Sequence, residues 1–234
     1  MFNISIDCIG SSSAGNCFII SGYKTKIFIE CGITIKKIAE HIGYKFSDFS
    51  ACLVSHSHLD HCKSAFEMAS RGVNVIAHKS VFDKFKEHHR FQNIPKKTFE
   101  VGEFKITPFK VEHDVKNYGF MIDSKISGER IIFIIDTYFS PFTFENVTHF
   151  IVEANHSEKI LEVNLEKSNN ARHLQRLWKS HMSIERTCDL LLANDLSKVK
   201  EIHLSHLSKG NGNGAEFKDI VEKLTEKRVL ICKQ

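Results

Sequence analysis

Hydrophobic and polar positions alternate in short runs along the first half of the chain, a pattern typical of β-strands separated by turns. It predicts strands over residues 2–9, 17–20, 26–30, 51–55 and 73–77. The second and third of these are joined as a hairpin by Ser21-Gly22-Tyr23-Lys24. Apolar residues at helical spacing predict helices over residues 33–42, 64–71 and 80–89.

The second half repeats this organisation, with β-rich runs followed by helical ones. Strands are predicted over residues 104–110, 118–122, 130–135, 150–153, 199–204 and 229–232. Helices are predicted over residues 157–177, 182–192 and 215–226. Two β-rich stretches that each end in helices predict one α/β domain over residues 1–234, with helices outside two facing sheets.

Composition places this domain among globular proteins. Of its 234 residues, 42% are hydrophobic and 26% are charged. No apolar run approaches the ~20 residues of a membrane helix, and the N-terminus lacks a secretory signal pattern, so we expect a cytoplasmic protein without a membrane partner. The net charge of +4 permits a polyanionic substrate but does not require one.

The seven cysteines indicate a reducing compartment. Their number is odd and no C-x-x-C pair occurs, which favours buried free thiols over a disulfide framework or a structural zinc ribbon. They are Cys8, Cys17, Cys31, Cys52, Cys62, Cys188 and Cys232.

Histidine is the unusual residue type, with 14 copies, and its placement points to a metal site. His56, His58, Asp60 and His61 form H-x-H-x-D-H directly after the strand predicted over residues 51–55. Imidazole and carboxylate are preferred ligands of zinc and similar divalent ions. Side chains at i and i+2 of an extended segment project the same way, so His56 and His58 can hold one metal together. Asp60 and His61 lie beyond the turn and can reach a second metal.

This motif resembles the signature of the metallo-β-lactamase superfamily. The resemblance implies a four-layer αββα sandwich, in which two mixed β-sheets are flanked by helices, and two divalent metal ions, Zn or Mn. It also implies that His113, Asp136 and His206, each at a predicted strand end, complete the ligand set. Metal one would be held by His56, His58, His113 and the bridging Asp136, and metal two by Asp60, His61, His206 and Asp136.

Two positions in this assignment are open. His203 lies three residues before His206, and the two would face opposite sides of a strand, so only one is expected to be a ligand; we prefer His206 because it falls at the strand end. Glu30 stands where the family usually has an aspartate that orients a metal-binding histidine. The longer glutamate can still accept from an imidazole N–H.

A glycine- and serine-rich loop over residues 10–17 resembles that of YycJ (WalJ)-type proteins, double-strand DNA 5′→3′ exonucleases, as does the stretch Val152–His156. Ser12, Ser13 and Asn16 in this loop are predicted to bind a substrate phosphate through hydroxyls and backbone N–H groups. The alternative is an ordinary turn between strands.

The resemblance implies that a hydroxide bridging the metals attacks phosphorus, with Asp60 as ligand and orienter. His181 is the candidate proton donor to the leaving oxygen; the alternative is a helix-terminal histidine without a role. For His156 we favour no role. Lys63, Arg172 and Arg176 are candidate contacts for a nucleic acid backbone.

Four functions are therefore weighed. A DNA exonuclease comes first, and a phosphodiesterase for small cyclic nucleotides second. A thioester or amide hydrolase of the same fold is disfavoured by His181 and the serine-rich loop. A metal-bound binding module without turnover is supported only by Glu30. The length leaves no room for the inserted domain of β-CASP enzymes, and whether the chain is a homodimer is left open.

Overall fold

The computed structural model describes residues 3–167 and 171–233, without the side chains of 171–173. The chain divides into two compact units. Unit 1 comprises residues 1–110, 115–129 and 233–234, and unit 2 comprises residues 111–114 and 130–232. The expectation that residues 1–234 act as one domain stays a prediction.

Unit 1 is built on a six-stranded sheet with the order β1-β2-β3-β4-β5-β6. The strands are β1 (Ser5–Gly10), β2 (Cys17–Ser21), β3 (Lys26–Ile29), β4 (Phe49–Leu53), β5 (Asn74–Ala77) and β6 (Phe91–Asn93). The first three pair antiparallel, and β3 to β6 pair parallel, so the sheet is mixed. Consequently the carboxyl ends of β3, β4, β5 and β6 share one sheet edge.

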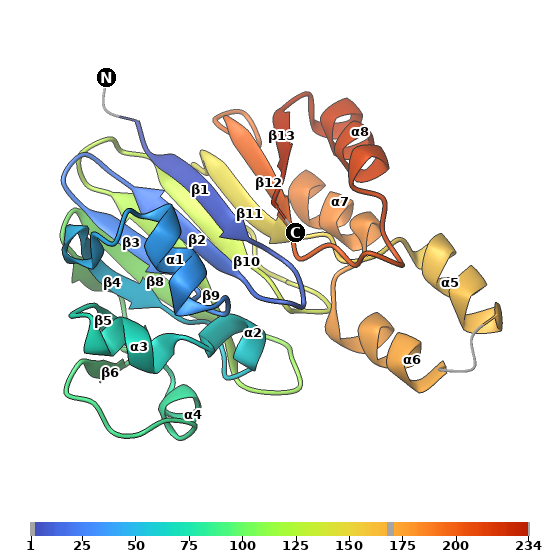
Figure 1. The fold of residues 1–234 in the computed structure, drawn as a ribbon. Coiled ribbons are helices and arrows are strands. Elements are labelled where there is room, and N and C mark those ends of the chain that lie inside the picture. Colours follow the sequence, from blue (N-terminus) through green and yellow to red (C-terminus); the bar gives the residue numbers. More distant parts are fainter. Residues whose placement is uncertain (1–2, 168–170, 234) are drawn as a thin grey trace. The chain divides into compact units, whose positions relative to one another are not determined.

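Helices cover this sheet through a continuous apolar core (Figure 1). Helix α1 (Ile35–His41) begins at Thr34, whose hydroxyl accepts from the backbone of Lys37, and α3 (Ala65–Ser70) follows the short α2 (Leu59–Cys62). Ile38 of α1 and Met68 of α3 are fully buried in the core. Unit 1 also holds η1 (Phe46–Asp48), α4 (Lys79–Phe82), and the neighbouring strands β7 (Phe99–Val101), β8 (Phe104–Val111) and β9 (Asn117–Ser124).

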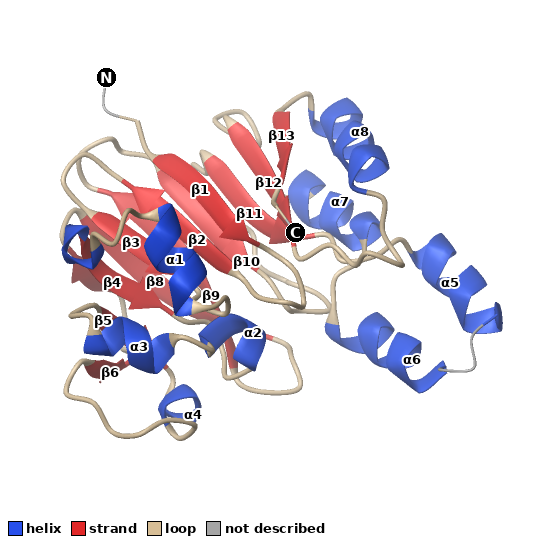
Figure 2. Cartoon of the chain, viewed as in Figure 1, coloured by secondary structure: helices blue, strands red, loops and turns tan. Residues whose placement is uncertain are grey.

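Unit 2 contains four parallel strands in the order β13-β12-β11-β10, accompanied by helices (Figure 2). The strands are β10 (Arg130–Ile134), β11 (His149–Glu153), β12 (Glu201–Ser205) and β13 (Arg228–Ile231). The helices are α5 (Glu158–Lys167), α6 (Ala171–Ser180), α7 (Ile184–Leu192) and α8 (Gly214–Thr225). Every residue of β11 is buried, as is typical of a parallel strand covered on both faces.

These elements confirm the α/β class, but some predicted boundaries are wrong. The helix expected over residues 80–89 ends at Phe82, because Phe82 and Phe85 turn toward Phe91 and the core; the Phe82 and Phe91 rings stack 4.5 Å apart. Apolar spacing there reflects core packing. Strands β6 and β7 were not predicted.

Among the described residues, the helix expected over residues 157–177 corresponds to α5 and α6. Residue 2 of the first predicted strand, and residues 168–170, lie outside the described residues. Among the helices that are described, none is long and apolar enough to cross a membrane.

Candidate metal centre

In unit 1, the H-x-H-x-D-H residues gather just past the carboxyl end of β4. His56 and His61 are fully buried, and their ring centroids lie 4.1 Å apart. The Nε2 atom of His56 lies 3.0 Å from Nδ1 of His58, so the two imidazoles face a common point. The hydroxyl of Ser55 lies 2.9 Å from Nδ1 of His56 and orients that ring. Asp60 stands 3.4 Å from Nε2 of His61. Three imidazoles and a carboxylate thus converge within residues 56–61, which run from the end of β4 into α2 and are called the histidine loop below.

The serine- and glycine-rich loop supports this histidine loop. The backbone N–H of Asn16 donates to the carbonyl of Asp60 at 2.7 Å, and the Asn16 side-chain amide donates to the same carbonyl at 3.2 Å. That amide nitrogen also lies 3.2 Å from Nε2 of His61. Gly32 completes the support, because a Cβ there would overlap the backbone of Asp60. Asn16 therefore positions the metal motif from a fully buried site.

The two serines predicted to bind phosphate differ in exposure. Ser12 is buried, and its hydroxyl accepts from the backbone N–H of Ala14, whereas Ser13 is exposed. Their contact with substrate stays a prediction. The structure gives this loop a supporting function that the sequence pattern did not indicate.

Glu30 follows β3 and is fully buried beside the histidine loop. Its carboxylate accepts from the backbone N–H of Ser55 at 3.2 Å and lies 3.6 Å from Nδ1 of His61. Burial raises the pKa of Glu30, and the nearby His61 partly offsets that rise. The glutamate thus reaches both the strand end and the imidazole, as an orienting carboxylate does.

In unit 2, Asp136 and His206 meet past the ends of β10 and β12. Nδ1 of His206 lies 2.8 Å from Asp136 Oδ1, and both side chains are nearly fully buried. His203 lies within β12, and its Nε2 is 3.2 Å from Glu201 instead. His206, which we preferred because it lies past the strand end, is thus the histidine that contacts Asp136.

Glu153 at the end of β11 is the residue that sequence reasoning missed. It is fully buried; its Oε1 lies 2.6 Å from Nδ1 of His181 and 3.1 Å from Nδ1 of His206. Its Oε2 accepts from the backbone N–H groups of Thr137 and Met182. The sequence could have indicated Glu153, because this carboxylate ends an apolar strand run just as Asp136 follows one.

His181 lies in the turn between α6 and α7, not inside a helix. Burial disfavours its charged form, but the carboxylates of Glu153 and Asp136 together outweigh this and raise the pKa of His181. In turn, burial opposes ionisation of Glu153, yet the charge of His181 and hydrogen bonds from the histidines lower the pKa of Glu153. Each of the two side chains therefore favours the charged form of the other.

His113 carries its buried side chain to the same region of unit 2. Its Nε2 lies 3.9 Å from Asp136 Oδ2 and 3.2 Å from Asp114. Burial lowers its pKa, which favours the neutral imidazole that binds metals. A pocket beside His113 is also lined by Arg176 and Lys179, and Arg176 pairs with Asp114 at 3.1 Å.

The remaining candidate residues are Lys63, Arg172 and His156. Lys63 is exposed at the end of α2. Arg172 lies among the residues whose side chains the structure does not describe. His156 is buried, and its ring lies 6.4 Å from that of Trp178.

Three of the site residues have a strained backbone. Glu30, Asp136 and His206 have φ values of 64°, 53° and 55°, in the left-handed region that side chains rarely adopt. Glu30 and His206 directly follow the last residue of a strand, and Asp136 lies two residues after the end of β10. Residues keep such a strained backbone only where the surrounding contacts hold them in place, and this is common at functional sites. Here the strained conformation turns three polar side chains away from their strands.

The donor set fits a divalent cation. In unit 2, Asp136, Glu153, His181 and His206 each offer a ligand atom within 4.8 Å of the others. In unit 1, the imidazoles of His56, His58 and His61 supply nitrogen donors beside the Asp60 carboxylate. Nitrogen and carboxylate donors of this kind suit Zn, Mn and related ions, so both clusters have the chemistry of metal sites.

Comparison with known proteins identifies the family. The β-lactamase superfamily domain matches residues 25–204. Exodeoxyribonuclease WalJ of Streptococcus pneumoniae is 28% identical over 227 residues, covering 87% of this chain and 81% of that protein. Exodeoxyribonuclease YycJ of Bacillus anthracis is 24% identical over 226 residues, covering 87% and 82%.

Solved structures show the same fold. YhfI of Bacillus subtilis, described as a metallo-β-lactamase fold protein, has a TM-score of 0.74 at 18% identity, covering 98% of this chain and 95% of that one. Yeast PDE1 has a TM-score of 0.70 at 12% identity, covering 100% and 98%. The predicted metallo-β-lactamase sandwich is thereby confirmed. The chain is thus similar to YycJ and WalJ over most of its length; it belongs to the metallo-β-lactamase superfamily and is a metal-dependent hydrolase.

Proposed function

We propose that this protein is a DNA exonuclease that cleaves phosphodiester bonds in the 5′→3′ direction at a two-metal centre. The observation that carries the proposal is the alignment over most of the chain with proteins named exodeoxyribonucleases, in a chain whose strand ends bear a full set of histidine and carboxylate donors. The donor set supports the hydrolytic chemistry directly.

The metal ligands are those that the sequence predicted. His56, His58 and His113 would hold one cation, and Asp60, His61 and His206 the other, with Asp136 shared between them. When bound, such cations lower the pKa of a coordinated water and neutralise charge on phosphoryl oxygens. The burial of His56, His61 and Asp136 supports this assignment, because buried donors are held in place before a cation arrives.

His181 is proposed to donate a proton to the leaving oxygen. Glu153 lies 2.6 Å from Nδ1 of His181 and raises the pKa of the imidazole, so His181 keeps its proton to a higher pH than an ordinary histidine does. A general acid with these properties assists departure of a poor leaving group such as a deoxyribose oxygen. Glu153 is then a positioning residue, since it acts through His181.

The supporting groups fix where the donors point. Asn16 and Gly32 hold the backbone of Asp60, and Glu30 stands beside His61. Arg176 and Lys179, in the pocket beside His113, are proposed to contact the phosphate next to the scissile one. We also propose that the protein works in the cytoplasm, because all seven cysteines are free thiols.

The test is turnover by the metal-loaded protein. Bis-p-nitrophenyl phosphate, 5′-labelled duplex DNA, single strands and cyclic nucleotides would each be incubated with Mn and with Zn. We expect mononucleotides to be released from a DNA end, and the release to be lost in His58→Ala/Asp60→Ala. Cleavage of cyclic nucleotides with DNA left intact would replace this proposal with the small-substrate enzyme. If neither metal supports phosphodiester cleavage, both the exonuclease and the small-substrate phosphodiesterase are contradicted.

A further inference from the structure

A positively charged groove lies in unit 1, at the sheet edge that carries the histidine loop. A groove of about 660 Å³ is lined by residues that include His78, Lys79, Lys96, Lys110, Lys116 and Tyr118. The four lysines are exposed, and among the described residues no carboxylate lines this groove. Within the described chain none of the four ammonium groups is in an ion pair, so their charge is available to a ligand.

The topology of unit 1 explains why these side chains meet beside the histidine loop. Because β4, β5 and β6 are parallel, the residues that follow them share one edge. The histidine loop follows β4, Lys79 follows β5, and Lys96 follows β6. Neighbouring strands lie ~4.8 Å apart, so this edge extends ~10 Å from the histidine loop to Lys96.

Backbone hydrogen bonds fix the groove to the histidine loop. The N–H of Tyr118 donates to the carbonyl of Ser55, the residue before His56, at 3.2 Å. The N–H of Ile94, close to Lys96 in the chain, donates to the carbonyl of Ala77 at 2.8 Å. The half-buried rings of Tyr118 and His78 lie 6.2 Å apart and nearly parallel on the groove wall. The groove is therefore held in a fixed position relative to His56.

We infer that this groove binds the phosphate backbone of the DNA that lies beyond the scissile bond. The inference rests on the proposed function, which places a scissile phosphate at the histidine loop. Lysine ammonium groups act as point charges toward phosphate and do not read bases, so the contact is independent of sequence. With a rise of ~3.4 Å per nucleotide, ~10 Å of edge accommodates about three nucleotides.

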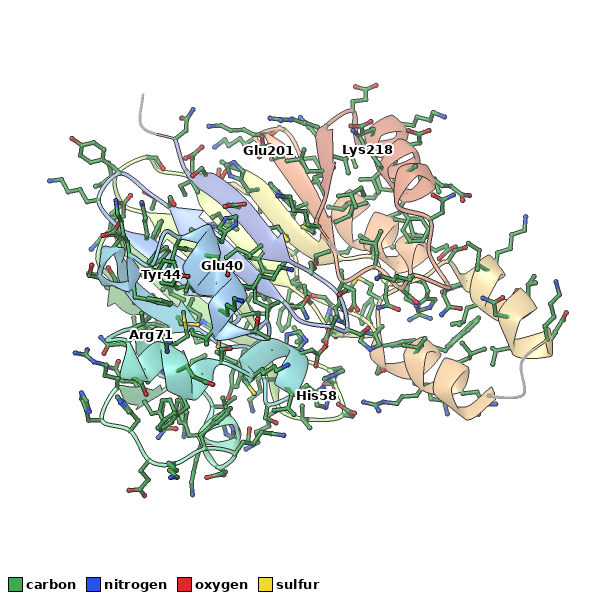
Figure 3. The ribbon with its side chains drawn as sticks, in the orientation of Figure 1. Glu40, Tyr44, His58, Arg71, Glu201 and Lys218 are labelled. Carbon is green, nitrogen blue, oxygen red and sulfur yellow. The ribbon has the colours of Figure 1, made fainter. Side chains whose placement is uncertain are left out.

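The test compares two double variants with the same loss of charge. Lys96→Gln/Lys116→Gln alters the groove. Lys26→Gln/Lys45→Gln is the matched control, because Lys26 begins β3 and Lys45 precedes β4, at the opposite sheet edge. Figure 3 labels Tyr44, the neighbour of Lys45, well away from His58. Binding of fluorescent duplex DNA would be followed by anisotropy over a range of salt concentrations, without added metal.

We expect the groove variant to bind DNA at least about tenfold more weakly than the control variant, with a salt dependence smaller by about one unit per lysine. We also expect the KM of the groove variant to rise for long DNA and to stay unchanged for a dinucleotide. Its turnover of bis-p-nitrophenyl phosphate checks that the metal centre is intact. Equal affinity and equal salt dependence in the two variants would overturn the proposal that this groove binds DNA. If the wild-type protein neither binds nor cleaves DNA, the proposed function itself fails, and this result is distinct from the first.

Discussion

The side-chain amide of Asn16 donates to the backbone carbonyl of Asp60, 44 residues further along the chain, at 3.2 Å. The backbone N–H of Asn16 donates to that carbonyl as well, at 2.7 Å. Asp60 belongs to the histidine motif, and Asn16 to the serine- and glycine-rich loop. These two sequence patterns are therefore one structural unit, in which the second holds the first in position.

We predict that Asn16→Ala lowers metal affinity by about 10- to 100-fold, the usual effect of losing a group that orients a ligand. The carbonyl of Asp60 loses one donor and His61 loses a polar neighbour, while every proposed ligand is retained. Calorimetric titration of the metal-free protein with Zn or Mn measures the change. Asn3→Ala, at an exposed position, is the control. Unchanged affinity in Asn16→Ala would show that the loop does not position the ligands.

Gly32 imposes a second, steric requirement on the same contact. A Cβ at this position would overlap the backbone carbonyl of Asp60, so Gly32→Ala must displace the histidine loop. We expect a loss of roughly 2–4 kcal/mol in the free energy of unfolding, together with weaker metal binding. Chemical denaturation with and without metal measures both effects. Gly210→Ala is the matched control, since a Cβ there meets open space; equal stability of the two variants would contradict the overlap.

The sequence pointed to the proposed metal donors more readily than to the groups that support them. His56 was proposed because the histidine motif follows an apolar strand run, a local signal, and Asp136 because of the family resemblance. Glu153 carries the same local signal, but its link to His181 spans 28 residues and depends on how β11 and the turn after α6 pack. Asn16 was read as a phosphate contact because a Gly/Ser loop suggests anion binding; its bonds to Asp60 depend on tertiary contacts.

The helix predicted over residues 80–89 failed for a related reason. Phe82 is the last residue of α4 and Phe85 lies beyond the helix, yet both pack against the core, where Phe91 of β6 joins them. Apolar spacing reports which residues are buried, and a short segment can bury them without a regular helix.

The free cysteines give a prediction that does not involve the metals. Cys8 and Cys188 are half-buried, whereas the other five thiols are buried. Burial raises the pKa of Cys188 to about 11, and the thiolate is the reactive form. We expect Cys188 in the native protein to be labelled by iodoacetamide at a rate that rises about tenfold per pH unit between pH 7 and 10. Mass spectrometry of the labelled protein identifies the sites.

Unfolding in guanidinium supplies the control for this measurement. All seven thiols should then react at a similar rate, since none is in a disulfide. Fast labelling of five or more thiols in the native state at pH 7 would contradict the burial of Cys17, Cys31, Cys52, Cys62 and Cys232.

The pair of Glu153 and His181 gives a pH dependence with a definite sign. Glu153 raises the pKa of His181, and the proton donor is active only while it is protonated, so activity should fall as the pH rises through that raised pKa. Glu153→Gln keeps the shape but removes the charge, and we expect the alkaline limb to move to lower pH. The pH profile of kcat for DNA cleavage by wild type and variant measures this shift.

The leaving group distinguishes proton donation from a merely structural contribution. p-Nitrophenolate leaves without a proton, so the rate for bis-p-nitrophenyl phosphate should be far less sensitive to Glu153→Gln and to His181→Gln than the rate for DNA. Thermal unfolding of both variants checks that the fold is intact, which matters because Glu153 is fully buried. Equal losses with both substrates would assign His181 to metal binding, consistent with its 3.7 Å approach to Asp136, and remove it as the proton donor.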